Sequence, residues 1–149
     1  MRCIAIDDEP VALSIISQYC KRIGNIELSV YSDPISGINN VIETNPDILF
    51  LDIDINGVSG VELAKSLPKG TYLIFTTAYA QFALDGFELN AVDYLYKPFS
   101  FSRFERAVQK VRDLLQMQKL VQEKLSASKE ITIKVEYQNC GYTIYRSYG

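Results

Sequence analysis

The chain has 149 residues, of which 48% are hydrophobic and 22% charged, and its formal net charge is −3, so we expect one globular domain with a short extension. Histidine is absent, so the protein has neither a histidine general base nor a histidine metal ligand. The three cysteines form no C-x-x-C pair, which indicates buried, reduced thiols. No apolar run approaches the roughly 18 residues that span a bilayer, and the N-terminus lacks the features of a signal peptide. We therefore expect a cytoplasmic protein without membrane contact.

The first half of the chain alternates short apolar runs, typical of buried strands, with helical periodicity. The strands are predicted at 3–6, 26–31 and 48–51, the last ending at Asp52. A helical stripe of apolar residues fills 10–23 and ends at Gly24. A second helix begins at Asp33, whose side chain suits the N-cap, and Pro34 fits the first helical position.

The same alternation continues in the second half. Further strands are predicted at 72–76 and 94–96, and helices at 61–67 and 81–88, the former preceded by a loop through Gly57 and Gly60. The last helix is capped by Ser100 or Ser102, because Ser102-x-x-Glu105 fits a capping box. Its apolar stripe reaches Leu115, and the helical pattern runs on toward Leu125.

Five strands that alternate with five helices predict an α/β fold, a doubly wound, flavodoxin-like parallel sheet of five strands with helices on both faces. Function in such sheets lies at the carboxyl ends of the strands. At those ends the sequence places three carboxylates, two hydroxyls and a lysine: Asp7, Asp8, Asp52, Thr76, Thr77 and Lys97.

These side chains suit the chemistry of phosphate. Three carboxylates at one edge repel one another, so they persist only with a cation or with raised pKa values. An all-oxygen acidic cluster of this kind suits Mg²⁺. A carboxylate such as Asp52 can attack phosphorus and form an aspartyl phosphate. A magnesium ion and a lysine such as Lys97 would neutralise the charge of the transferred group. The sequence thus predicts phosphorylation of Asp52 with Mg²⁺ as cofactor.

The ordered set of motifs strongly resembles bacterial receiver domains of the CheY-like kind over about residues 1–115. The resemblance is carried by Asp7-Asp8-Glu9, Leu51-Asp52, Thr77-Ala78 and Lys97-Pro98-Phe99. It implies a two-component response regulator that receives its phosphoryl group from a sensor histidine kinase. Such a protein is not an enzyme beyond its own phosphotransfer and autodephosphorylation.

The resemblance also implies a role for each site residue. Asp52 is the phosphoacceptor, Asp8 binds Mg²⁺ directly, Asp7 binds it through water, and the backbone carbonyl of Asp54 completes the protein ligands. Lys97 pairs with the phosphoryl group, and its peptide bond to the following proline is expected to be cis.

A switch pair and a subclass follow from the same resemblance. Thr77 and Tyr94 look like the switch, in which the hydroxyl moves toward the phosphoryl group while the ring turns inward. The segments 76–79 and 90–95 are similar to receivers that precede LytTR-type (LytR/AgrA-type) domains. This implies a homodimer that controls transcription through a DNA-binding output domain. Asn56 departs from the family pattern, which usually has proline there.

The C-terminal part has a different character. Residues 1–102 hold 6 Lys and Arg against 13 Asp and Glu, whereas residues 103–149 hold 9 against 5, which fits a regulatory domain joined to something else or a solvated basic helix. We expect a receiver domain at 1–115, a helical linker at 116–129 and a β-hairpin at 130–149. The hairpin resembles the opening of a LytTR-type domain, so the chain is expected to be a truncated regulator.

Two other functions share part of the pattern. Asp52-x-Asp54 after an apolar strand also resembles haloacid-dehalogenase-type phosphohydrolases, although in that family the motif follows the first strand and the acidic pair comes last. A pseudo-receiver that docks without phosphate is the other alternative. Turnover of a phosphate ester would identify the first, and failure to accept phosphate from a small donor would identify the second.

Overall fold

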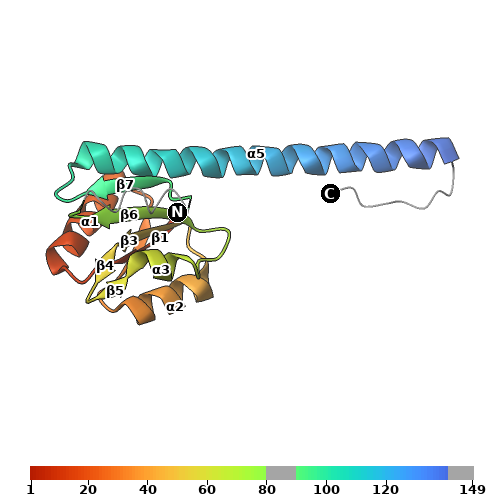
Figure 1. Cartoon of the computed structure of the whole chain (residues 1–149). Helices are drawn as coiled ribbons and strands as arrows, with labels where there is room; N and C mark the ends of the chain where they lie inside the picture. Colours follow the sequence, from red (N-terminus) through yellow and green to blue (C-terminus); the bar gives the residue numbers. More distant parts are fainter. Residues whose placement is uncertain (80–89, 141–149) are drawn as a thin grey trace. The chain divides into compact units, whose positions relative to one another are not determined.

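Five strands form a parallel sheet in the order β2-β1-β3-β6-β7 (Figure 1). The strands are β1 (Arg2–Ile6), β2 (Glu27–Tyr31), β3 (Ile48–Asp52), β6 (Tyr72–Thr77) and β7 (Asp93–Tyr96). This confirms the predicted five-stranded parallel sheet. The computed structural model describes residues 1–79 and 90–140, with the side chains of 1–79 and 90–128. The chain divides into two units, Met1–Val111, which holds this sheet, and Arg112–Gly149.

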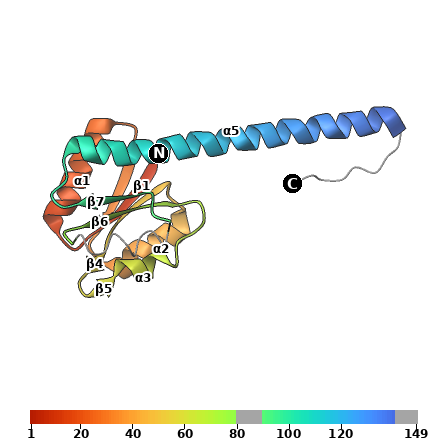
Figure 2. The ribbon, with the colours of Figure 1, turned by 45° about the horizontal axis from the view of Figure 1, so that its top comes forward.

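Helices cover both faces of the sheet, as predicted (Figure 1 and Figure 2). Helices α2 (Pro34–Thr44) and α3 (Gly60–Ala64) lie on one face. Helix α1 (Pro10–Ile23) and the first turns of α5 (Phe101–Cys140) lie on the other. The helix predicted at 81–88 falls outside the described residues.

Local sequence signals begin and end these helices. The Asp33 carboxylate accepts a hydrogen bond from the backbone N–H of Ser36 at 2.9 Å, so Asp33 caps α2 as predicted. Helix α1 ends at Gly24, whose φ of 85° is one that a residue with a side chain rarely adopts. The Ser100 hydroxyl accepts from the N–H of Arg103 at 3.1 Å. Ser100 therefore caps α5, and the capping box at Ser102 is not formed, because Ser102 already lies inside the helix.

The core is built around β3, whose residues are all buried. Such a continuously apolar strand is typical of a parallel sheet with two covered faces. Phe50 on β3 stacks on Phe104 of α5 with ring centroids 5.1 Å apart, and on the opposite face Leu49 and Leu51 pack with Ile38 of α2. Each large apolar side chain buried in this way contributes about 1.5–3 kcal/mol, so the packing holds the ends of the strands in place.

A small hairpin follows β3 where the sequence predicted only a loop. Strands β4 (Asp54–Ile55) and β5 (Val58–Ser59) pair antiparallel, and Asn56 and Gly57 form the turn with φ values of 53° and 80°. Positive φ at both central residues is the geometry of a type I′ turn, for which Asn-Gly is a favoured sequence. The Asn-Gly pair was therefore a usable signal that the sequence analysis missed.

The hairpin predicted for 130–149 is not confirmed, because its first strand, Ile131–Tyr137, is helical as part of α5. An isolated two-stranded hairpin is marginal in water, whereas a helix satisfies its backbone hydrogen bonds within its own segment. The second predicted strand, 142–148, lies outside the described residues. Residues 116–129 also belong to α5. Among the described helices, none is both long and apolar enough to cross a bilayer.

Candidate functional site

The register of the parallel strands brings the predicted site residues to one edge of the sheet. Ile6 of β1 lies opposite Leu51 of β3, so the residues that follow them, Asp7 and Asp52, are neighbours at the carboxyl ends of these strands. Thr77 of β6 lies opposite Tyr96 of β7, and Lys97 comes next. The backbone N–H of Lys97 donates to the carbonyl of Thr77 at 2.7 Å, which fixes the start of the loop that follows β7.

Lys97 reaches into a cluster of three carboxylates. Its Nζ lies 2.7 Å from Asp7 Oδ2, 2.8 Å from Glu9 Oε1 and 3.3 Å from Asp52 Oδ2. The peptide bond between Lys97 and Pro98 is cis, as expected. The Lys97 side chain is only 13% exposed, so its charge is poorly hydrated and depends on these carboxylates for compensation.

Burial and charge shift the pKa values of this group. Burial of Asp52 raises its pKa, and the neighbouring charge of Asp7 raises it further, so that the pKa is about 7 although Lys97 opposes the shift. For Lys97, burial lowers the pKa, but the contacts with Asp7 and Glu9 and the charge of Asp52 outweigh burial and raise the pKa above its ordinary value. Burial and the charge of Asp7 thus destabilise the negative charge of Asp52 more than Lys97 stabilises it.

The donor set of this edge fits a hard cation. Asp7, Asp8, Glu9 and Asp52 each offer a carboxylate oxygen, and these oxygens lie within 4.8 Å of one another. Asp7 Oδ2 is buried and has an ion pair with Lys97 but no hydrogen-bond partner among the described residues. Four acidic groups with one lysine leave an excess of negative charge, and oxygen ligands of this kind suit Mg²⁺.

Asp8 is held in place by the backbone of the β4–β5 turn. Its Oδ2 accepts a hydrogen bond from the N–H of Asn56 at 2.8 Å. The proline that is usual in the family at this position has no N–H and could not donate this bond. Asparagine in place of proline at position 56 therefore adds a backbone hydrogen bond to the carboxylate of Asp8.

Asp54, predicted to contribute its backbone carbonyl, is the first residue of β4. Its side chain accepts a hydrogen bond from the N–H of Gly57 at 3.1 Å and so closes the turn. This contact accounts for the carboxylate of Asp54, which is exposed and is not among the four clustered acids.

Gly60, which the sequence analysis assigned only to a loop, packs directly against the Asp52 backbone. Its N–H donates to the carbonyl of Ile53 at 2.6 Å. A Cβ atom at this position would collide with the carbonyl oxygen of Asp52, and backbone atoms at such a contact have little room to move. Only glycine allows α3 to begin so close to the end of β3.

We expect Gly60→Ala to lower the free energy of unfolding by about 2 kcal/mol or more, the size of an overpacking strain in a well-packed region. Gly70→Ala is the matched control, because a Cβ there meets nothing within 4 Å, and it is expected to change stability by less than about 0.5 kcal/mol. Urea denaturation of both variants checks the difference, and equal stabilities would contradict the steric account.

The two residues of the predicted switch are both buried. The Thr77 hydroxyl accepts a hydrogen bond from the backbone N–H of Tyr79 at 2.9 Å. Tyr94 stacks on Phe75 with ring centroids 5.3 Å apart and an interplanar angle of 29°, so its ring lies in the core. The structure therefore places Thr77 at the end of β6, next to the strand that ends at Asp52, and Tyr94 on the neighbouring β7 with its ring in the core.

A salt-bridge cluster ties the backbone of Tyr94 to α5. Arg103 donates two hydrogen bonds to the carboxylate of Asp93, at 2.5 Å and 2.8 Å, and a third to the carbonyl of Tyr94 at 3.0 Å. Lys110 also donates to Asp93, at 3.0 Å. Burial of Asp93 raises its pKa, but the hydrogen bonds from Arg103 and Lys110 outweigh burial and hold the pKa below its ordinary value. Sequence spacing could not reveal this cluster.

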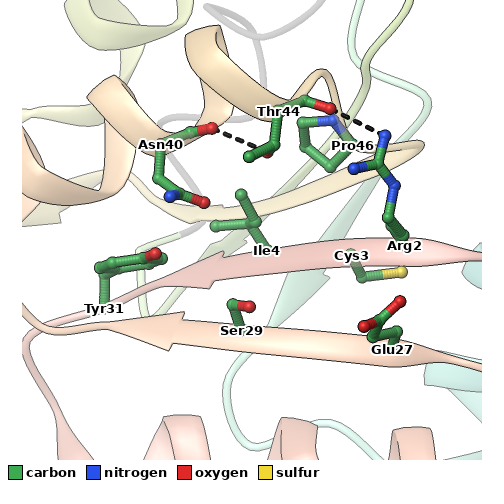
Figure 3. Close-up of a pocket in the computed structure, with 9 residues that line it drawn as sticks. All are labelled: Arg2, Cys3, Ile4, Glu27, Ser29, Tyr31, Asn40, Thr44 and Pro46. Carbon is green, nitrogen blue, oxygen red and sulfur yellow. Dashed lines mark hydrogen bonds between the residues drawn. The ribbon is translucent and has the colours of Figure 1, made fainter.

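A separate hollow of about 280 Å³ lies at the amino ends of β1 and β2, beneath α2 (Figure 3). The Arg2 guanidinium donates to the carbonyls of Thr44 and Asn45 at 2.8 Å and 3.4 Å, and the Thr44 hydroxyl donates to the carbonyl of Asn40 at 2.7 Å. These bonds satisfy carbonyls at the C-terminus of α2, where a cation is also favoured. The hydrogen bonds of Arg2 and Thr44 in this hollow therefore serve the end of the helix.

Comparison with known protein families and proteins agrees with this geometry. The family model described as response regulator receiver domain matches residues 3–109. The chain is 34% identical over 116 residues to the sensory transduction protein LytT of Bacillus subtilis, covering 75% of this chain and 48% of that protein. It is 38% identical over 122 residues to the transcriptional regulatory protein LytR of Staphylococcus aureus, covering 75% and 47%. The chain thus spans about half the length of these relatives.

Solved structures show the same fold. The response regulatory domain of protein mrkE from Klebsiella pneumoniae superposes with a TM-score of 0.72 and 28% identity, covering 78% of this chain and 99% of that chain. The response regulator protein TrrA from Thermotoga maritima, solved in complex with Mg(2+)-BeF, superposes with a TM-score of 0.67 and 26% identity, covering 74% and 97%.

Proposed function

Because the chain belongs to the family of response regulator receiver domains, we propose that Asp52 accepts a phosphoryl group with the help of Mg²⁺ and that this modification switches the protein between two states. The observation that carries the proposal is the group at the carboxyl edge of the sheet, where Lys97 contacts both Asp52 and Asp7 and the acidic oxygens lie within 4.8 Å. Mass measurement before and after incubation with a small phosphodonor tests it.

The proposed chemistry is a direct phosphoryl transfer. An oxygen of the Asp52 carboxylate attacks the phosphorus of a phosphohistidine, the phosphorus–nitrogen bond breaks, and its electron pair stays with the imidazole nitrogen, which is then protonated. Lys97, at 3.3 Å from Asp52 Oδ2, neutralises charge on the transferred group. The raised pKa of Asp52 means that a cation in the site favours the ionised, nucleophilic form.

The proposed ligands of the magnesium ion are Asp8, Asp52 and the backbone carbonyl of Asp54, with Asp7 acting through water. When bound, the ion would supply charge neutralisation for the acidic cluster and the phosphoryl oxygens. The hydrogen bond from Asn56 orients Asp8 for this role. The relative TrrA, whose solved structure is described as a complex with Mg(2+)-BeF, supports the assignment.

We propose that the donor is a sensor histidine kinase. A mainly apolar hollow of about 280 Å³ opens beside Lys97 and offers a place for part of the donor protein. It is lined by Glu9, Val11, Ala12, Ile15, Ala78, Lys97, Pro98 and Phe99. Val11, at the start of α1, is 69% exposed, so this part of the apolar lining is accessible to a partner.

Thr77 and Tyr94 are the proposed switch. The Thr77 hydroxyl would donate to a phosphoryl oxygen, and the ring of Tyr94 would hold the inward position in one state and leave it in the other. A phosphoryl group adds roughly −1.5 to −2 charges and acts only by stabilising one of the two states more than the other. The bonds of Arg103 to Asp93 and to the Tyr94 carbonyl connect this change to α5.

We expect Thr77→Ala to accept phosphate at a rate within about fivefold of wild type, because one hydrogen bond is worth only about 1 kcal/mol. The variant should lose phosphate-dependent self-association, because the bond to the phosphoryl group exists in only one of the two states. Sedimentation velocity with and without phosphodonor measures the effect. Wild-type protein without donor gives the baseline, and phosphate-driven association that persists unchanged in the variant would exclude this switch.

The output is proposed to be transcription control by a homodimer in the cytoplasm, through a DNA-binding domain that follows the receiver in the full regulator. The relative LytR is named a transcriptional regulatory protein, and the chain spans about half of its length. Support for self-association comes from α5, where apolar side chains with intervals of three and four residues are exposed: Leu114, Met117, Val121 and Leu125.

The order of the acidic motifs favours this function over a phosphohydrolase. Asp7 and Asp8 follow β1, and Asp52 ends β3, which is the reverse of the order expected for the haloacid-dehalogenase type. We therefore propose no enzymatic activity beyond the protein's own phosphotransfer and autodephosphorylation. Uptake of a single phosphoryl group without turnover of phosphate esters separates the two functions and also excludes a pseudo-receiver.

A further inference from the structure

Glu9 makes a contact that neither the sequence motifs nor the proposed phosphoacceptor function assigns. It follows Asp7 and Asp8 at the end of β1 and stands at the N-cap position of α1. No side-chain capping hydrogen bond is formed there. The carboxylate instead reaches a lysine 88 residues away in the chain, with Oε1 2.8 Å from Lys97 Nζ.

Lys97 is shared between three carboxylates, and Asp52 is the most distant of them. The separations from Nζ are 2.7 Å to Asp7, 2.8 Å to Glu9 and 3.3 Å to Asp52. An ammonium group carries a single positive charge, so each further carboxylate in contact with it lessens the charge compensation that the others receive. The partner that the proposed chemistry needs therefore has the longest contact.

The two closer partners differ in their freedom to move. The side chain of Asp7 is 1% exposed, whereas that of Glu9 is 60% exposed. Releasing a lysine from an exposed glutamate costs little, because water replaces the lost contact. Releasing it from Asp7 would leave a buried carboxylate without compensation. Glu9 is thus the partner that Lys97 can exchange for a new anion.

From this arrangement we infer that Glu9 is a positioning residue that holds Lys97 toward the mouth of the site before phosphorylation and gives it up to the phosphoryl group on Asp52. The inference rests on the proposed function of Asp52. Its consequence is that Glu9 slows phosphorylation, because Lys97 must leave this contact before it neutralises the incoming phosphoryl group.

The test compares rates of phosphorylation by acetyl phosphate at saturating Mg²⁺. Glu9→Gln is expected to raise the rate constant about three- to tenfold, the effect of removing one charged competitor at a partly buried lysine. Glu9→Asp keeps the charge, but its side chain is one methylene shorter and is a good N-cap for α1. It should therefore reach Lys97 less well and also raise the rate constant. Glu43→Gln, at an exposed position on α2, is the control and should change the rate less than about twofold.

A Lys97→Ala background separates the action of Glu9 through Lys97 from a simple field effect. There Glu9→Gln should change the residual rate less than about twofold, because the residue it acts through is gone. An equal rate increase in both backgrounds would overturn the inference, and so would a wild-type rate in Glu9→Asp. A loss of Mg²⁺ affinity of about tenfold or more in Glu9→Gln, measured by calorimetry, would instead identify Glu9 as a metal ligand.

A measurement without phosphodonor distinguishes a failure of this inference from a failure of the proposed function. In urea denaturation, Glu9→Gln, Lys97→Ala and the double variant should be non-additive by at least about twofold in the unfolding equilibrium constant, as expected for residues in contact. Absence of labelling in wild type would overturn the phosphoacceptor proposal, while this cycle would still report on the contact. Additivity would show that Glu9 does not hold Lys97.

Discussion

Asp52→Asn is expected to take up less than about 1% of the phosphoryl label that wild type takes up, because an amide oxygen is a far weaker nucleophile than a carboxylate. The other carboxylates of the cluster are engaged: Asp7 with Lys97 at 2.7 Å and Asp8 with the Asn56 N–H at 2.8 Å. Intact mass measurement after incubation with acetyl phosphate and Mg²⁺ gives the stoichiometry directly.

Two further variants make the result specific. Asp8→Asn retains the nucleophile but removes a proposed ligand, so labelling should survive at high Mg²⁺ with a requirement for the ion raised by about tenfold or more. Asp113→Asn, at an exposed position on α5, is the matched control and should be labelled like wild type. Full labelling of Asp52→Asn would show that the acceptor lies elsewhere.

Asp52→Asn is also expected to stabilise the protein at neutral pH, by about 2–4 kcal/mol at pH 8 in the absence of Mg²⁺. Burial, followed by the charge of Asp7, raises the pKa of Asp52 from 3.8 to about 7. Each unit of difference between folded and unfolded pKa corresponds to about 1.4 kcal/mol. A variant with a neutral amide avoids the cost of a buried charge next to other acids.

The sign of the pH dependence follows from proton linkage. Between pH 4 and pH 7 the folded protein holds a proton on Asp52 that the unfolded chain has lost, so the free energy of unfolding falls as pH rises through this window. Asp52→Asn removes this contribution. The difference in stability between variant and wild type should therefore be small near pH 4, grow up to about pH 7 and stay constant above it.

Urea denaturation of both proteins across this pH range measures the difference, and other titrating groups cancel in the comparison. Mg²⁺ should reduce the difference in stability between variant and wild type at pH 8, because a cation that binds the folded wild type stabilises it by mass action. The variant should gain less from the ion, because it lacks one of the acidic oxygens. A difference in the free energy of unfolding that is independent of pH, or that grows toward pH 4, would show that the negative charge of Asp52 does not destabilise the folded protein.

The sequence by itself determined the fold class and the position of most site residues. Apolar runs of three to six residues between helical stripes predicted the parallel sheet, and the rule that function lies at the carboxyl ends of its strands selected Asp7, Asp8, Asp52, Thr77 and Lys97. These signals are local, because each depends on the residue types at the end of one strand. Helix signals at Asp33 and Gly24 worked for the same reason.

The tertiary structure decided how these residues meet. The contact of Glu9 with Lys97 and the bonds of Arg103 to Asp93 join residues on different elements, and no periodicity encodes such distances. The close approach of Gly60 to the Asp52 carbonyl depends on where α3 begins in space.

In the C-terminal part a local sequence pattern predicted the wrong secondary structure. Alternating residues at 131–137 predicted a strand, yet a strand is stable only when a neighbour satisfies its backbone groups, and the segment is helical in this structure. A helix needs only its own chain for its hydrogen bonds, whereas a sheet needs partners that a local pattern cannot guarantee. Residue types therefore determined which groups stand at the edge of the sheet, and only the packed chain decided which of them contact Lys97.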